Sequence, residues 1–353
     1  MAALGSPVVI DGSHGEGGPA LVRTALVMSA LTRQPLRIEY IRGATPSPGL
    51  KPEDMAIMRA VAMSTSAEII GAEVGSSTVS FLPTRTPKGV NAQMDVPDDV
   101  DGPGSANALV MLNAITPVMA RTGVYTQLVA KGETYGTHVL SYDYFANVTL
   151  AAYKKAGLYA YPELVAAGFG RYGRGEVSLS IEPSAISPID WSRRGKLLQC
   201  RALVAYAEVP DPVGQRGVSH LARLGFNAKL AIDAEAVRVK AAGPGAFVTV
   251  WAEYERGFGG ATALGSKGVR IESVVQSAFE SFLQWQSTDA AVDPYLADQI
   301  LVPAAIAGGK STYGTSLITQ RLLTTIWVIK QFLPIHITVH GQENGPGTVT
   351  ISP

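Results

Sequence analysis

The sequence is poor in cysteine and in charged residues, and each shortage excludes a class of protein. Cys200 is the single cysteine among 353 residues, which excludes an internal disulfide framework and a cysteine-rich zinc site. Charged residues make up 16% of the chain and hydrophobic residues 46%, so the chain can fill a large core and is too apolar to be disordered. The histidines show no zinc-helix signature, and we predict no metal-binding residues.

Signals for membranes and secretion are also missing. The segment before Asp11 lacks the basic start and long apolar stretch of a signal peptide, and no run approaches the ~18 apolar residues of a membrane span. Lysine plus arginine equals aspartate plus glutamate at 29 each, so no basic excess supports many phosphate contacts. We therefore expect a cytoplasmic protein without membrane or DNA partners, in which any contact with RNA is local, for example to one strand end.

Strand and helix patterns alternate along the chain and predict a mixed α/β fold. Apolar spacing predicts strands at 8–10, 79–81, 124–129, 177–181, 335–339 and 348–351, and helices at 19–31, 53–70, 107–119, 144–155 and 322–332. Pro19 suits the first turn of its helix, where a missing N–H costs nothing. The recurrence every several tens of residues suggests a repeated unit without a repeated sequence.

The alternation changes character between residues 187 and 288. This stretch has its own predicted strands at 197–206, 228–232 and 247–252, and its own helices at 213–224 and 271–285. We predict one large domain from residues 1–186 and 289–353, with residues 187–288 as an inserted small α/β domain.

A glycine-rich segment, Asp11 to Gly18, lies between the first predicted strand and helix. Backbone N–H groups of such a loop can approach a phosphate at a helix N-terminus. The segment has neither the Rossmann glycine spacing nor the Gly-Lys-Ser/Thr of a P-loop. From spacing alone the simpler interpretation is a tight turn, with Glu16 favoured near the helix start by the macrodipole.

A second polar group follows Pro294. On a helix, Tyr295, Asp298 and Gln299 fall on one face at i, i+3 and i+4. Such a face can read a base or a ribose, or it can be the solvated side of the helix.

Two further groups also allow both a functional and a structural interpretation. Arg171 and Arg174 lie in a glycine-rich turn, where they can grip a phosphate or stay solvated. Glu53 and Asp54 are adjacent carboxylates that suit the first turn of a helix, with metal binding as the alternative.

In combination, segments along nearly the whole chain resemble the RNA 3'-phosphate cyclase family. The segments are Asp11 to Arg23, Ile41-Arg42 with Pro48 to Leu50, Gly168-Phe169 with Gly173 to Val177, Gly195 to Gln199, Ala291 to Gln299, and Phe332 to Pro334. The resemblance implies a large domain of three repeated units, each with two helices against a four-stranded sheet, related to the enolpyruvyl transferases. A small α/β domain is inserted before the last repeat.

The resemblance also implies an activity. The family uses ATP, with a divalent metal such as Mg²⁺, to activate an RNA 3'-phosphate. A histidine takes AMP and passes it to the phosphate, and the neighbouring 2'-hydroxyl displaces AMP to leave a 2',3'-cyclic phosphate. The implied ligands are therefore a nucleotide and an RNA 3' end, while the oligomeric state stays open.

Positions that match the family's motifs supply the candidate site. We predict as cofactor-binding the residues Glu16, Arg23, Tyr295, Asp298 and Gln299. We predict as substrate- or phosphate-binding the residues Arg42, His138, Arg171 and Arg174.

Several positions depart from the family, above all Arg321. It stands where the family carries its nucleophilic histidine, and arginine stays protonated and cannot attack ATP. Other departures exchange cationic or amide side chains for neutral or acidic ones: Thr45 and Ser47, Glu53-Asp54 for Gln-His, His14 and Ala20 for glutamines, and Tyr135 to His138 for an Asn-Pro-rich loop. We predict that the scaffold is kept and the AMP-histidine chemistry is lost, with Arg321, His14 and Glu16 as the candidate catalytic residues.

Four functions remain open. The first is an ATP-using enzyme in which His14 or His138 replaces the nucleophile, or Arg321 stabilises charge in a direct transfer. The others are a non-catalytic RNA- or protein-binding factor, an enolpyruvyl-transferase-like enzyme by kinship of fold alone, and an enzyme for another phosphorylated substrate with a metal on Glu53 and Asp54. An ion pair between Arg321 and Glu16 would explain the substitution at 321 as repurposing.

Overall fold

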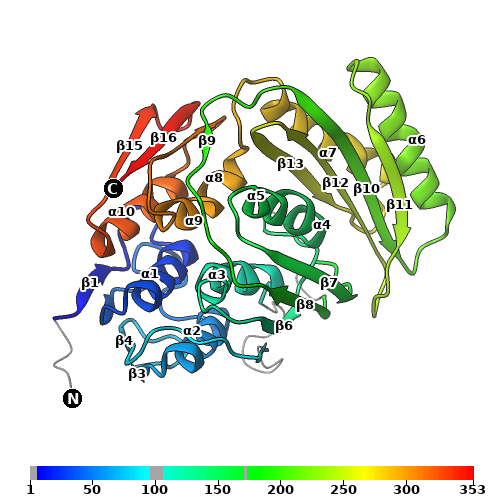
Figure 1. Cartoon of the computed structure of the whole chain (residues 1–353). Helices are drawn as coiled ribbons and strands as arrows, with labels where there is room; N and C mark the ends of the chain where they lie inside the picture. The colour runs from blue at the N-terminus through cyan, green and yellow to red at the C-terminus, as the bar shows by residue number, and fades with distance from the viewer. Residues whose placement is uncertain (1–5, 96–105, 138, 171–172) are drawn as a thin grey trace.

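The fold begins with a unit of four strands and two helices (Figure 1). The computed structural model describes residues 6–95, 106–137, 139–170 and 173–353. The first unit contains β1 (Val8–Asp11), α1 (Pro19–Thr32), β2 (Leu36–Glu39), α2 (Pro52–Thr65), β3 (Glu68–Ile70) and β4 (Val79–Leu82). β1 and β2 are parallel, the other pairs are antiparallel, and the strand order is β1-β2-β4-β3.

The same arrangement occurs twice more. The second unit contains β5 (Ala92–Met94), α3 (Ala108–Ala120), β6 (Thr126–Gly132), α4 (Tyr142–Tyr144), η1 (Phe145–Thr149), α5 (Leu150–Lys155), β7 (Ala160–Ala166) and β8 (Gly175–Ile181). The third contains β9 (Asp190–Trp191), α8 (Pro294–Gln299), α9 (Leu301–Ala305), β14 (Ser311–Thr315), α10 (Gln320–Phe332), β15 (His336–Gly341) and β16 (Gly347–Ser352). Their strand orders, β5-β6-β8-β7 and β9-β14-β16-β15, repeat the first pattern, and again only the first pair is parallel. The predicted α/β fold of three repeated units is confirmed.

A fourth sheet lies between β9 and α8 in the sequence. It is built from β10 (Leu197–Ala207), α6 (Pro212–Asn227), β11 (Asp233–Arg238), β12 (Gly245–Tyr254), β13 (Gly257–Leu264) and α7 (Ile271–Gln286), with the order β11-β10-β12-β13. Helices α6 and α7 contact each other and pack on this sheet (Figure 1). β9 pairs with β14, so residues 190–191 belong to the third sheet although they fall within the predicted insertion. The domain division at residues 187 and 288 stays a prediction.

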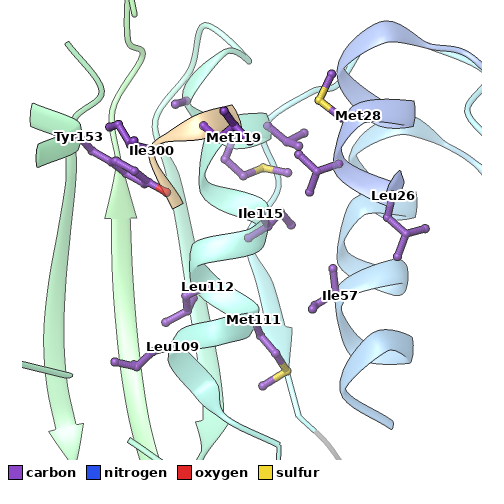
Figure 2. Close-up of a cluster of buried hydrophobic side chains, with 14 of the residues drawn as sticks. Leu26, Met28, Ile57, Leu109, Met111, Leu112, Ile115, Met119, Tyr153 and Ile300 are labelled. Atoms are coloured by element: carbon purple, nitrogen blue, oxygen red, sulfur yellow. The ribbon is translucent and has the colours of Figure 1, made fainter. Parts of the chain in front are cut away.

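The main core lies where α1, α2 and α3 contact one another. Figure 2 shows Met111 and Ile115 on the side of α3 that is nearer Ile57, with Leu109 and Leu112 on the opposite side. Most of α3 is apolar and buried, while Val110, Asn113 and Ala114 on one of its faces are half-buried. Among the described helices, none is long and apolar enough to cross a bilayer.

Two sequence predictions need correction, and one strand was missed. The helix predicted to reach residue 70 ends at Thr65, because Ser66 adopts a left-handed φ of 47° and β3 follows. The strand predicted at 228–232 begins at Asp233 instead, because Lys229 adopts a φ of 56° as the chain leaves α6. β13 was not predicted, because its glycines, such as Gly259 and Gly260, interrupt the apolar alternation that marks a strand.

Candidate functional site

A cavity of about 600 Å³ lies where the three units meet the fourth sheet. Its lining includes Glu16 and Arg23 from the first unit, Asn107 from the second, Arg321 from the third, and Thr262 from β13. Small-molecule sites typically have volumes of about 300–1,000 Å³. The size and the mixture of charged and apolar walls therefore fit a small-molecule ligand.

Four of the longer described helices begin at this cavity. Pro19 opens α1, Glu53 is the second residue of α2, Asn107 caps α3, and Arg321 is the second residue of α10, and all four line the cavity. Helix N-termini carry partial positive charge, so this wall favours negatively charged groups. The chain supplies some of the acceptors itself, since the Asn107 side chain accepts from the backbone N–H groups of the first turn of α3.

Arg321 is held by an ion pair inside the cavity. Its Nη2 donates to Asp298 Oδ1 at 2.9 Å, and its guanidinium carbon lies 5.7 Å from the centroid of the Tyr295 ring. The two paired side chains are 30% and 15% exposed, and Arg321 Nε is a buried donor without a partner among the described residues. Burial raises the pKa of Asp298, and the Arg321 charge opposes that rise. The ion partner of Arg321 is therefore Asp298. The ion pair between Arg321 and Glu16 that was considered from the sequence does not form.

Glu16 lies in the glycine-rich loop, which is a tight turn and also lines the cavity. Its backbone N–H donates to Thr324 Oγ1 at 3.2 Å, which ties the loop to α10. Gly15 precedes it at a φ of 63°, and a Cβ there would lie 2.2 Å from Thr324 Oγ1. Burial raises the pKa of Glu16, and the nearby Arg321 charge opposes the rise. Among the described residues the Glu16 carboxylate forms no ion pair, so it is available to a ligand.

Arg23 and Glu53 form a second pair on the cavity wall. Arg23 Nη1 lies 3.4 Å from Glu53 Oε1, and Glu53 Oε2 accepts from the backbone N–H of Asn107 at 3.2 Å. Burial raises the pKa of Glu53, while the Arg23 charge lowers it. Glu53 thus combines its predicted place in the first turn of α2 with a place in the cavity.

Arg42 forms a third pair, which lies outside the cavity lining. Its Nη1 and Nη2 donate to Asp54 at 2.5 and 3.0 Å, and Nη1 also donates to the Gly49 carbonyl at 3.1 Å. Both side chains are buried. Three hydrogen bonds within the chain thus involve this guanidinium, and the phosphate-binding role of Arg42 stays a prediction.

The remaining predicted residues are dispersed. Gln299 lines the cavity and accepts from the Thr149 hydroxyl at 2.7 Å. The His14 ring stacks on Trp327 with centroids 3.9 Å apart, and it is not among the residues that line the cavity. Arg174 directly precedes β8, whereas His138 and Arg171 lie outside the described residues. The roles predicted for these residues stay predictions.

Asp293 is a site residue that sequence reasoning missed. Its Oδ1 accepts from the N–H groups of Tyr295 and Leu296, and its Oδ2 accepts from the Tyr144 hydroxyl at 2.7 Å and the Gly260 N–H at 2.8 Å. Burial raises its pKa to about 6. Asp293 therefore positions the helix that carries Tyr295 against the strand that closes the cavity. The sequence signal that could have identified Asp293 is its position directly before Pro294, because aspartate followed by proline is typical of a helix start.

The carboxylates of the cavity do not form a metal site by themselves. Among the described residues, no group of three or more histidine, cysteine, aspartate or glutamate side chains is arranged to hold a metal ion. Among the described residues, four of the charged groups of the cavity form two pairs of arginine and carboxylate, and Glu16 is outside both pairs.

The repeated fold and the cavity define an α/β protein with a cavity of small-molecule size where its units meet the fourth sheet. A model of the RNA 3'-terminal phosphate cyclase family matches residues 14–339. The chain is 34% identical over 325 residues to an RNA 3'-terminal phosphate cyclase of Gloeothece citriformis, covering 92% of this chain and 93% of that protein. It is 33% identical to cyclases of Methylococcus capsulatus, over 97% of this chain and 95% of the relative, and Thermococcus gammatolerans, over 98% and 97%. The chain therefore belongs to the RNA 3'-terminal phosphate cyclase family.

Proposed function

We propose that the chain is a nucleotide- and phosphate-binding enzyme that uses ATP on an RNA 3'-phosphate end, without attaching AMP to residue 321. The observation that carries the proposal is the place of Arg321, which lines the cavity beside Tyr295 and is ion-paired to Asp298. Because a guanidinium stays protonated, it can bind and stabilise negative charge but cannot act as a nucleophile.

The residues of the cavity fit a nucleotide. Tyr295 is 43% exposed, so its ring can stack on a base, and Gln299 offers an amide for polar contacts. The Arg321 side chain is 30% exposed, so its guanidinium can also donate to an acceptor oxygen of a ligand. Glu16 offers a carboxylate that can accept hydrogen bonds from ribose hydroxyls.

We assign the roles in the reaction from these positions. When bound, ATP supplies an adenylyl group to an oxygen of the RNA 3'-phosphate with pyrophosphate as the leaving group, and AMP leaves when the 2'-hydroxyl attacks that phosphate. Arg321 and Arg23 hold negative charge, because guanidinium groups pair well with phosphate oxygens. Glu16, whose pKa is raised by burial, accepts a proton from a hydroxyl more readily than an exposed carboxylate does. The described residues include no group of three or more histidine, cysteine, aspartate or glutamate side chains that would hold Mg²⁺, so these roles do not depend on a metal held by the protein.

Isothermal titration calorimetry with ATP and AMP tests this proposal. We expect the wild-type protein to bind a nucleotide and Arg321→Met to weaken binding at least about tenfold, a loss of about 1.4 kcal/mol. Lys330→Met is the matched control, because Lys330 is an exposed cation on the same helix. A wild-type protein that binds neither nucleotide would refute the proposal, and so would equal binding by all three proteins.

A second candidate is a non-catalytic factor that binds RNA or a protein partner. It is favoured by one observation, that Arg23, Arg42 and Arg321 are each paired with a carboxylate of the same chain. This candidate predicts tight association with a partner and no ATP consumption. The cytoplasmic location of the chain stays a prediction.

A further inference from the structure

The carboxylate of Glu53 lies where a bound anion would be expected. Its two oxygens contact an arginine, Arg23, and the backbone N–H of Asn107 at the start of α3, at 3.4 and 3.2 Å. An arginine and a helix N-terminus are together the usual partners of a phosphate group. Glu53 thus engages, from within the chain, the groups that a ligand phosphate would need.

The charge of the whole cavity points the same way. Among the described residues, its charged lining consists of three carboxylates, Glu16, Glu53 and Asp298, and two guanidinium groups, Arg23 and Arg321. When all five are ionised, one net negative charge remains. Both arginines already have a carboxylate partner within 3.4 Å. A ligand phosphate must therefore compete with these carboxylates and is also repelled by them.

We propose that Glu53 is a specificity-determining residue that competes with ligand phosphates for Arg23 and the N-terminus of α3. This inference rests on the proposed nucleotide site and specifies the charge of its ligand. With Glu53 in place, the cavity binds a nucleoside or nucleoside monophosphate more tightly than a nucleoside triphosphate that carries no divalent metal. Of the two carboxylates that are paired with cavity arginines, Glu53 is the one that also holds a helix N-terminus.

Glu53→Gln tests the proposal with little change in shape. The glutamine oxygen can still accept from the Asn107 N–H, while Arg23 loses its anionic partner. Calorimetry in EDTA would compare adenosine, AMP, ATP and inorganic pyrophosphate. Glu182→Gln is the matched control, because it removes the same charge from an exposed position just after β8.

We expect the wild-type protein to bind ATP no more tightly than AMP. Glu53→Gln should tighten ATP and pyrophosphate by at least about tenfold, or 1.4 kcal/mol, and change adenosine by less than about twofold. Glu182→Gln should match the wild type for every ligand. If Glu53→Gln does not fold, Glu53→Ala removes the same charge and carries the same expectation.

The outcomes separate this inference from the proposed function. Nucleotide binding with an unchanged ratio of ATP to adenosine affinity in Glu53→Gln overturns the role of Glu53 and leaves the proposed function standing. If Glu53→Gln gains pyrophosphate binding but neither protein binds an adenine compound, the role of Glu53 is supported and the proposed nucleotide binding is refuted. No binding of any probe by any variant overturns both.

Discussion

Replacing Asp143 by asparagine should change how the stability of the protein depends on pH. Asp143 is 4% exposed, and its Oδ1 accepts from the Tyr135 hydroxyl at 3.3 Å. Its Oδ2 is buried without a partner among the described residues. The Tyr135 ring contacts Phe169 and Phe247, so this pair fastens the segment after Tyr135, which lines the cavity, to the fourth sheet.

The size of the effect follows from the pKa of Asp143. Burial raises this pKa from 3.8 to about 7, the hydrogen bond from Tyr135 opposes the rise, and Glu235 adds to it. The folded protein therefore binds this proton more tightly than the unfolded chain does, and stability falls as pH rises from about 4 to about 7. At about 1.4 kcal/mol per pKa unit, a shift of about 3 units removes about 4 kcal/mol across that window.

Urea denaturation of the wild type and of Asp143→Asn at half-unit steps from pH 4 to pH 8 measures this contribution. Asparagine does not titrate, so any effect of the buried amide on the free energy of unfolding is the same at every pH. The variant therefore loses only the pH dependence that comes from Asp143. We expect the free energy of unfolding of the wild type to fall by about 4 kcal/mol relative to the variant between pH 4 and pH 7. Parallel curves for the two proteins would refute the reasoning.

Three further substitutions test the contacts around the cavity. Gly15→Ala forces a side chain into a left-handed backbone position against Thr324. We expect this change to lower the free energy of unfolding by at least about 1–2 kcal/mol in thermal unfolding and to weaken nucleotide binding. An unchanged binding isotherm would contradict the placement of this loop at the cavity. Asp298→Asn leaves Arg321 without its anionic partner, so the urea midpoint should correspond to a loss of about 1–3 kcal/mol; a midpoint equal to that of the wild type would mean that the pair contributes nothing. Asp293→Ala leaves without an acceptor the hydrogen-bond donors that hold α8 against β13. The free energy of unfolding should fall by about 3 kcal/mol or more in the same assay. A loss below about 1 kcal/mol would contradict the positioning role of Asp293.

Much of the fold could be predicted because its helices and central strands follow the spacing rules of apolar residues. The helix at Pro19 and the strand at 177–181 are examples, since each buries a regular apolar pattern. β13 could not be predicted in this way, because Gly257, Gly259 and Gly260 have no side chains to show the alternation. The end of α2 depends on the left-handed backbone of Ser66, which no spacing rule indicates.

The site was harder to predict than the fold, because its contacts join residues far apart in the chain. The spacing of Tyr295 and Asp298 did place both on one helix face at the cavity. The sequence could not show that Asp298 pairs with Arg321, 23 residues away, or that Glu16 contacts Thr324 across 308 residues. Glu53 was predicted as a helix-start residue, with metal binding as the alternative. Its pairing with Arg23 could not be predicted, because it arises from the packing of α1 on α2.

The central claim is that Arg321 binds nucleotide without becoming covalently attached to it. Intact-mass analysis after incubation with Mg²⁺ and ATP tests it most directly, with Arg321→His as a comparison that carries an imidazole at the same position. We predict an unshifted mass for the wild-type protein under conditions in which calorimetry detects bound nucleotide. A mass increase of one AMP that peptide mapping places on residue 321 of the wild-type protein would contradict the account.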